Sequence, residues 1–211
     1  MIKSFIKRWK LIIKEDYRKF IFMLVLLVIA ARINTLAGRY TSSSGWALAP
    51  DIILDIIPAI NLEFIFVYVW LGIIFFLFLY TVLIKPKKTL EVLFHWSLLL
   101  IVIATFIILT HLKTPIEAAP MVFPTLFKGL RFTNDLFFSG HTALPLVGFF
   151  VFRESKIRYF FLASSLLMGF TVLATHQHYS IDVFAAFFIA YGTFKLGQHI
   201  MKKLGWLKQK H

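Results

Sequence analysis

Long apolar stretches separated by short polar segments dominate the chain. Six of them approach the roughly 20 residues that a helix needs to cross the hydrocarbon core of a bilayer. They cover residues 20–36, 62–84, 90–110, 139–152, 159–174 and 181–200. Because a spanning segment must satisfy its backbone hydrogen bonds internally, this pattern predicts an all-α integral membrane protein, a bundle of six transmembrane helices.

Composition agrees with this prediction. Hydrophobic residues make up 59% of the 211 residues and charged residues only 16%, whereas soluble domains are about 45–50% apolar. This excludes a soluble enzyme, a disordered tail and a coiled coil. The chain has no cysteine, which excludes disulfides, thiolate metal ligands and a cysteine nucleophile. We expect a single membrane-embedded domain over residues 1–211.

The net charge of +13 follows the expected topology. Six helices put both termini on one side, and 18 of the 23 Lys and Arg residues then lie on that side, against 5 on the other. Cytoplasmic segments carry such an excess. We therefore expect cytoplasmic termini, with basic segments at 1–19 and 201–211, in a plasma or inner membrane. No further feature indicates binding of nucleic acid.

The opposite face carries two long loops, at about 38–61 and 111–138, and a short connection at 175–180. Long loops in compact domains are often functional. The PDIILDIIP stretch at 50–58 has apolar residues at helical spacing, which predicts a short interfacial helix.

Two histidines mark the borders between these loops and the helices. His141 lies where the second loop becomes the fourth helix. His178 opens the sixth helix, and Asp182 follows four residues later, on the same helical face. A carboxylate at that spacing can hold one imidazole nitrogen, fix the tautomer and leave the other nitrogen free to react.

The start of the fourth helix suits an anion. Ser139 is a favourable N-cap, and Gly140 allows close approach of a ligand to the backbone. Free N–H groups at a helix N-terminus favour a phosphate. Two histidines, a carboxylate and a helix N-terminus at the membrane boundary indicate phosphoryl transfer on an amphiphile. One histidine would attack phosphorus, and the other would protonate the leaving alkoxide.

A metal site is the alternative use of the same residues, since two histidines and a carboxylate can bind iron or zinc. The spacing of His176 and His178 would not place both rings on one helical face, however. We therefore expect no metal and no other cofactor. We interpret His95 and His199 as packed or interfacial residues.

The segments Asp135–Thr142 and His178–Val183 resemble the second and third signature motifs of the type-2 phosphatidic acid phosphatase superfamily, and more closely those of its sphingomyelin synthase branch. The resemblance implies six membrane helices, cytoplasmic termini and an active site on the extracytoplasmic face. It also implies His178 as the nucleophile, Asp182 as its orienting carboxylate and His141 as the general acid and base.

The candidate substrate-binding residues come from these motifs and the preceding loop: Ser139, Gly140, Asp135, Tyr179, Lys128 and Arg131. The phosphatase branch has a Lys-x6-Arg-Pro motif and an arginine upstream of its third-motif histidine, and both are absent here. Lys113, Lys128 or Arg131 would have to hold the phosphate instead. The absence favours the synthase-like branch and a phosphodiester head group. The Ala49-Pro50-Asp51 stretch is weakly similar to a Pro-Leu-Pro-Asp stretch of that branch.

We therefore expect a lipid phosphotransferase or phosphoesterase that acts through a phosphohistidine, with a membrane lipid as substrate and a lipid hydroxyl or water as acceptor. One alternative is a lipid phosphate phosphatase. The other is a non-catalytic lipid-binding or transport protein. The sequence leaves the head group, the acceptor and the oligomeric state open.

Overall fold

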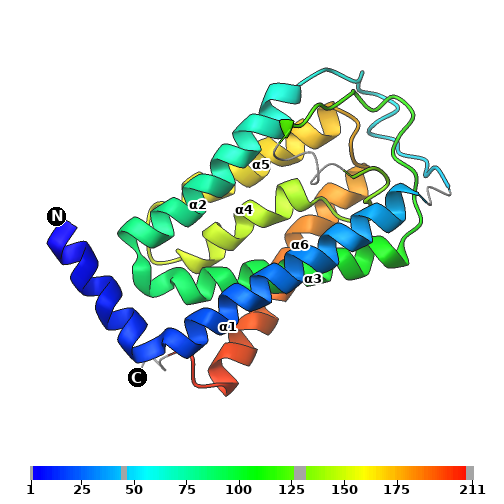
Figure 1. Cartoon of the computed structure of the whole chain (residues 1–211). Coiled ribbons are helices and arrows are strands. Elements are labelled where there is room, and N and C mark those ends of the chain that lie inside the picture. The colour runs from blue at the N-terminus through cyan, green and yellow to red at the C-terminus, as the bar shows by residue number, and fades with distance from the viewer. Residues whose placement is uncertain (1, 44–46, 126–131, 208–211) are drawn as a thin grey trace.

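The computed structural model describes residues 2–43, 47–125 and 132–207, and in these ranges the fold is all-α (Figure 1). The elements are α1 (Ile2–Ser42), the π-helix η1 (Phe64–Val69), α2 (Trp70–Ile84), the short 3-10 helix η2 (Pro86–Lys88), α3 (Thr89–Leu109), α4 (Gly140–Val151), α5 (Arg158–Ala174) and α6 (Ser180–Lys203). Within the described ranges, the only β-type pairing is an isolated bridge between Ala47 and Leu112. The predicted all-α fold is confirmed, while four of the six expected helices have the length of a membrane span.

Four of these helices are long and apolar enough to cross a membrane. They cover Asp16–Ser42, Phe64–Ile84, Pro86–Leu109 and Ser180–Lys203. The first apolar stretch is part of a longer helix, α1, in which Asp16 has non-helical backbone angles. Figure 1 shows that the segment before Asp16 projects away from the bundle, while the rest of α1 runs beside α3.

The fourth and fifth apolar stretches form helices shorter than a membrane span. α4 has 12 residues and α5 has 17. At 1.5 Å per residue, α4 is about 18 Å long, so it crosses only part of a bilayer. Non-helical backbone at membrane depth is tolerated where protein buries it or where it lines a cavity, and α4 begins beside such a cavity, described below.

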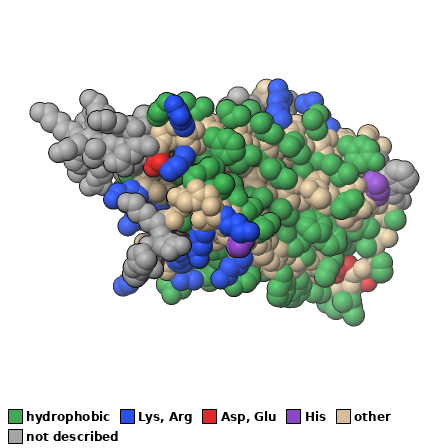
Figure 2. Space-filling view, turned by 90° about the horizontal axis from the view of Figure 1, so that it is seen from below, with side chains coloured by type: hydrophobic (Ala, Val, Ile, Leu, Met, Phe, Trp, Pro, Cys, Tyr) green, Lys and Arg blue, Asp and Glu red, His purple; other side chains and the backbone are tan. Residues whose placement is uncertain are grey.

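Large apolar side chains cover the outside of the bundle. Val28 on α1, Phe75 on α2 and Phe188 on α6 are 62%, 68% and 76% exposed. Figure 2 shows hydrophobic side chains over the middle of one face of the molecule, with Lys and Arg mainly toward the end that carries the start of α1 and the end of α6. Hydrocarbon tails are the solvent that such a surface requires, so this is an integral membrane protein.

α4 lies at the centre of the bundle, in contact with α2, α3, α5 and α6. Gly148 brings α5 close, because a Cβ at this position would lie 2.5 Å from the ring of Phe161. The Ser165 hydroxyl of α5 donates a hydrogen bond of 2.7 Å to the carbonyl oxygen of Thr142. This packing fixes the first turn of α4, which carries His141.

The two long loops and the α5–α6 connection meet at one end of the bundle, opposite the end that carries the start of α1 (Figure 1). The predicted helix at 50–58 is not formed, and hydrogen-bonded turns take its place. Asp51 Oδ1 accepts the N–H groups of Ile53 and Leu54, at 2.9 and 3.2 Å. A side chain that bonds its own loop in this way offers the backbone an alternative to a helix.

The orientation in the membrane stays a prediction, which single cysteines can test because the chain has none of its own. Ile56→Cys and Ile116→Cys, at positions 76% and 81% exposed in the two long loops, should react with an impermeant thiol reagent added to intact cells. Lys87→Cys and Glu154→Cys, at the opposite end, should react only after permeabilisation. The reverse labelling pattern would put both termini outside.

Candidate active site

The start of α6 holds a histidine–carboxylate pair. Asp182 lies in the first turn, and its Oδ2 atom accepts the backbone N–H of Tyr179 at 3.1 Å as part of a capping box. The same oxygen is 3.0 Å from Nδ1 of His178. Asp182 is fully buried and His178 nearly so. Helix capping and imidazole orientation thus depend on one carboxylate oxygen, and Nε2 is the nitrogen of His178 left for chemistry.

The pair also sets the protonation of His178. Burial lowers the pKa of its imidazole, but the hydrogen bond and the charge of Asp182 raise it, and so does the charge of Asp135. The raising effects are the larger, so the pKa of His178 lies above its ordinary value. A reaction that used the neutral imidazole of His178 as nucleophile would therefore become faster as the pH rises through this pKa.

His141 lies in the first turn of α4 and packs between two aromatic rings. Its ring centroid is 4.1 Å from that of Phe66, in η1, and 4.5 Å from that of Trp70, at the start of α2. Its buried Nε2 has no hydrogen-bond partner in the described part of the chain. The aromatic contacts orient the imidazole, and its unpartnered Nε2 is the kind of buried polar atom that a bound ligand could satisfy.

A backbone contact joins the two motifs. The N–H of Ser139 donates to the carbonyl oxygen of Asp182 at 3.0 Å. Ser139 is fully buried and caps α4, because its hydroxyl oxygen accepts the N–H of Thr142 at 3.3 Å. The helix starts that carry His141 and His178 are therefore held next to each other.

Both histidines line one cavity of about 200 Å³. Its described lining consists of Phe66, Thr114, Ala118, Ala119, Pro120, Met121, Phe123, Phe132, Thr133, Asp135, His141, Gln177 and His178. No Lys or Arg is among these residues. The polar residues of this lining are two histidines, two threonines, one glutamine and one aspartate.

Asp135 is the only carboxylate in that lining. Burial raises its pKa, the neighbouring His178 opposes the rise, and the result is a pKa of about 6. Asp135 is half-buried as a residue and lines the cavity. At neutral pH it is mainly ionised and gives the cavity a negative charge.

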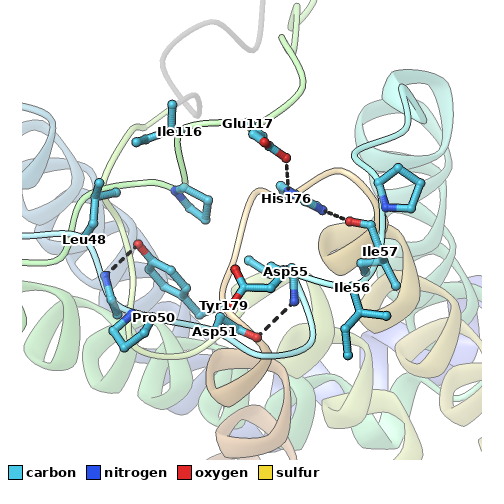
Figure 3. A pocket seen from close by; sticks show the side chains of 14 residues that line it. Leu48, Pro50, Asp51, Asp55, Ile56, Ile57, Ile116, Glu117, His176 and Tyr179 are labelled. Carbon is cyan, nitrogen blue, oxygen red and sulfur yellow. Dashed lines mark hydrogen bonds and ion pairs between the residues drawn. The ribbon is translucent and has the colours of Figure 1, made fainter.

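The structure brings together His141, His178, Asp182 and Asp135 of the predicted site residues. Ser139 and Gly140 form the start of α4 and are not in the described lining of the cavity. Tyr179 also lies outside this lining, and its side chain faces the neighbouring pocket shown in Figure 3. Lys128 and Arg131 lie outside the described residues.

The remaining described histidines lie elsewhere. His95 is buried on α3, where Nδ1 is 2.7 Å from the carbonyl oxygen of Glu91. His199 is exposed on α6. His111 is 3.3 Å from the hydroxyl of Tyr40. His176 is buried, with Nε2 3.0 Å from the carbonyl oxygen of Ile57.

Sequence reasoning did not identify Phe66 and Trp70. Their spacing of four residues at the loop end of the second apolar stretch was the available signal, but it is also common among lipid-facing aromatics. Gln177 was missed as well. Its Nε2 donates to the carbonyl oxygen of Ala119 at 2.7 Å and thereby ties the 111–138 loop to the cavity wall.

Comparison with known proteins agrees with this geometry. Residues 133–200 match the family model described as PAP2 superfamily C-terminal. Sphingomyelin synthase-related protein 1 of Homo sapiens is 40% identical over 73 residues, which cover 32% of this chain and 18% of that protein. The protein of the same name from Mus musculus is also 40% identical over 73 residues, or 15% of its length. The resemblance to the type-2 phosphatidic acid phosphatase superfamily, and within it to the sphingomyelin synthase-like branch, is thereby confirmed.

Proposed function

We propose that this protein is a lipid phosphotransferase that moves a phosphorylated head group through a phosphohistidine. The observation that carries the proposal is the pairing of His178 with Asp182 at 3.0 Å in a cavity that His141 also lines. A nucleophile with an orienting carboxylate, and a second group free to exchange a proton, are the parts that two-step group transfer requires. The PAP2 match covers all three residues.

In the first half-reaction, Nε2 of His178 attacks phosphorus, and the bond between phosphorus and the lipid oxygen breaks. His141 donates a proton to this leaving oxygen, so the lipid departs as an alcohol. The phosphorylated imidazole gains positive charge, which the buried carboxylate of Asp182 stabilises. Low dielectric strengthens that attraction relative to water.

In the second half-reaction, His141 removes the proton from an acceptor hydroxyl. The acceptor oxygen attacks phosphorus, the phosphorus–nitrogen bond breaks, and His178 is regenerated as the neutral ring. Water and a lipid alcohol would follow the same steps. The apolar surroundings of the motifs, including Phe138 and Val183, which are 1% and 9% exposed, favour a lipid acceptor over water.

The cavity lining favours a zwitterionic phosphodiester as substrate. A phosphomonoester carries up to two negative charges, and the described lining offers it no Lys or Arg but one carboxylate, Asp135. Three phenylalanines line the cavity as well: Phe66, Phe123 and Phe132. Aromatic faces together with a carboxylate attract an ammonium group. We therefore propose a head group that combines one phosphodiester with one cationic nitrogen.

Purified protein incubated with head-group-labelled phospholipids, with and without an added lipid alcohol such as ceramide, tests the proposal. We expect labelled head group to pass into a new lipid when the alcohol is present. A rapid quench should trap label on protein as an acid-labile, alkali-stable adduct. A constant yield of the hydrolysis product across all acceptors would favour the lipid phosphatase alternative. No turnover and no adduct on any lipid would favour the non-catalytic alternative.

His141→Gln should reduce turnover of lipid substrates by about 10²–10⁴-fold, the usual contribution of a positioned acid–base group. The loss should be much smaller for a phosphodiester with a nitrophenyl leaving group, because that group needs no protonation. Single-turnover release of the leaving group from both substrates, in the wild type and the variant, measures this for the first half-reaction alone. An equal loss for both substrates would contradict the acid role.

A further inference from the structure

We infer that Asp51 and Tyr179 are positioning residues, which hold the start of α6 in the orientation that the His178–Asp182 pair requires. The catalytic meaning of this inference rests on the proposed function. Its geometry rests on contacts between the first long loop and residues 179–180. Neither side chain lines the catalytic cavity, so each would act through His178.

Asp51 caps α6 from a distant part of the chain. Its Oδ2 atom accepts the N–H of Ser180, the first residue of α6. Its Oδ1 atom is occupied by the N–H groups of Ile53 and Leu54. The first N–H groups of a helix have no partner within the helix, and that end carries partial positive charge. A buried carboxylate therefore stabilises the start of α6.

The charge of Asp51 is maintained by these contacts. Burial raises the pKa of its carboxyl group, but hydrogen bonds from Ser180, Leu54 and Ile53 lower it by more, and the pKa lies below its ordinary value. The residue is 8% exposed. Asp51 is thus an ionised, fully engaged group rather than a surface carboxylate.

Tyr179 provides a second link. It is 2% exposed, its hydroxyl accepts the N–H of Ala49 at 3.1 Å, and it donates to the carbonyl oxygen of Lys113 at 2.9 Å. The two loops are joined to each other where the N–H of Lys113 donates to the carbonyl oxygen of Ala47 at 2.7 Å. Figure 3 shows the Tyr179 side chain reaching toward the segment around Leu48 and Pro50.

Residues 176–179 form a wall between two cavities. Gln177 and His178 line the catalytic cavity, whereas His176 and Tyr179 line a neighbouring pocket of about 560 Å³. Asp51 and Tyr179 thus line the pocket on one side of this wall, and His178 lines the catalytic cavity on the other side. Because Asp182 Oδ2 bonds both the N–H of Tyr179 and Nδ1 of His178, a displacement of Tyr179 changes the His178–Asp182 contact.

Asp51→Asn and Tyr179→Phe test the inference, with Asp55→Asn as the matched control. Asparagine has one acceptor oxygen, so it cannot serve Ser180 and its own loop together. Asp55 is an exposed carboxylate of the same loop, so its replacement removes an equal charge and leaves the contact between Asp51 and Ser180 in place. We expect kcat to fall by about 10- to 100-fold in both test variants, as for small misplacements of a reacting group. KM of the two test variants should change little, and Asp55→Asn should keep both kcat and KM close to those of the wild type.

Titration of the His178 ring by NMR gives a readout that does not depend on turnover. Its resonance is identified by its loss in His178→Gln. Weaker contact with Asp182 should lower the pKa of His178 in Asp51→Asn and Tyr179→Phe, and the acidic limb of the kcat profile should move to lower pH. If Asp51→Asn does not fold, the same two measurements on Tyr179→Phe test the inference.

Folded Asp51→Asn and Tyr179→Phe proteins that match Asp55→Asn in kcat and in the His178 titration would overturn the inference. A wild-type protein that turns over no lipid would overturn the proposed function instead. In that case, a lowered pKa of His178 in the two variants would still support the positioning role.

Discussion

His178→Gln should abolish lipid turnover and the acid-labile phosphoprotein together. Glutamine is close in size to histidine and can donate a hydrogen bond to Asp182, but it has no nucleophilic nitrogen. Covalent catalysis divides one difficult step into two easier ones, so its loss removes the reaction path rather than slowing one step. Rates over the pH range and rapid-quench labelling, compared with the wild type, measure this.

His199→Gln is the matched control for this variant. His199 lies on the same helix and is exposed, so its replacement should leave both readouts close to those of the wild type. A folded His178→Gln protein that keeps normal turnover would show that the nucleophile lies elsewhere.

Asp182→Asn should reduce kcat by about 10²–10⁴-fold, by analogy with the carboxylate of serine proteases. The amide oxygen can take the place of Oδ2 and accept from both Tyr179 and His178, so the helix cap is kept. What is lost is the negative charge that stabilises the phosphorylated imidazole. The amide nitrogen then takes the place of Oδ1, which has no hydrogen-bond partner in the described structure.

The pH dependence separates this loss from unfolding. The charge of Asp182 raises the pKa of His178, so Asp182→Asn should lower that pKa. In the proposed mechanism the neutral ring attacks, so the acidic limb of the residual rate should move to lower pH. Asp55→Asn serves again as the control for charge. An unchanged acidic limb, in a folded variant with reduced kcat, would mean that His178 does not titrate in the rate-limiting step.

The sequence predicted those features that depend on residues close to one another along the chain. Apolar stretches of membrane-spanning length predicted the helices, because each must satisfy its own backbone. The contact between His178 and Asp182 was also predictable, because residues four apart at the start of a helix lie on the same face of it.

Contacts between distant segments could not be predicted in this way. The packing of Phe66 and Trp70 on His141 depends on where α2 meets α4, which no local pattern specifies. The helix expected at 50–58 failed because the Asp51 carboxylate bonds its own loop and Ser180, about 130 residues away in sequence. The spacing of apolar residues carries no information on whether a polar side chain will bond to the backbone in place of a helix.

The shortness of α4 has a consequence for how a lipid would reach the site. His141 packs on the third and seventh residues of the span Phe64–Ile84, which lie within about 9 Å of the loop end of that span along the helix axis. The reacting phosphorus would therefore lie below the level where that span begins. Raising a lipid toward water costs about 0.8 kcal/mol for each methylene exposed. A recessed site avoids this cost, because donor and acceptor lipids can react while their acyl chains stay in the leaflet.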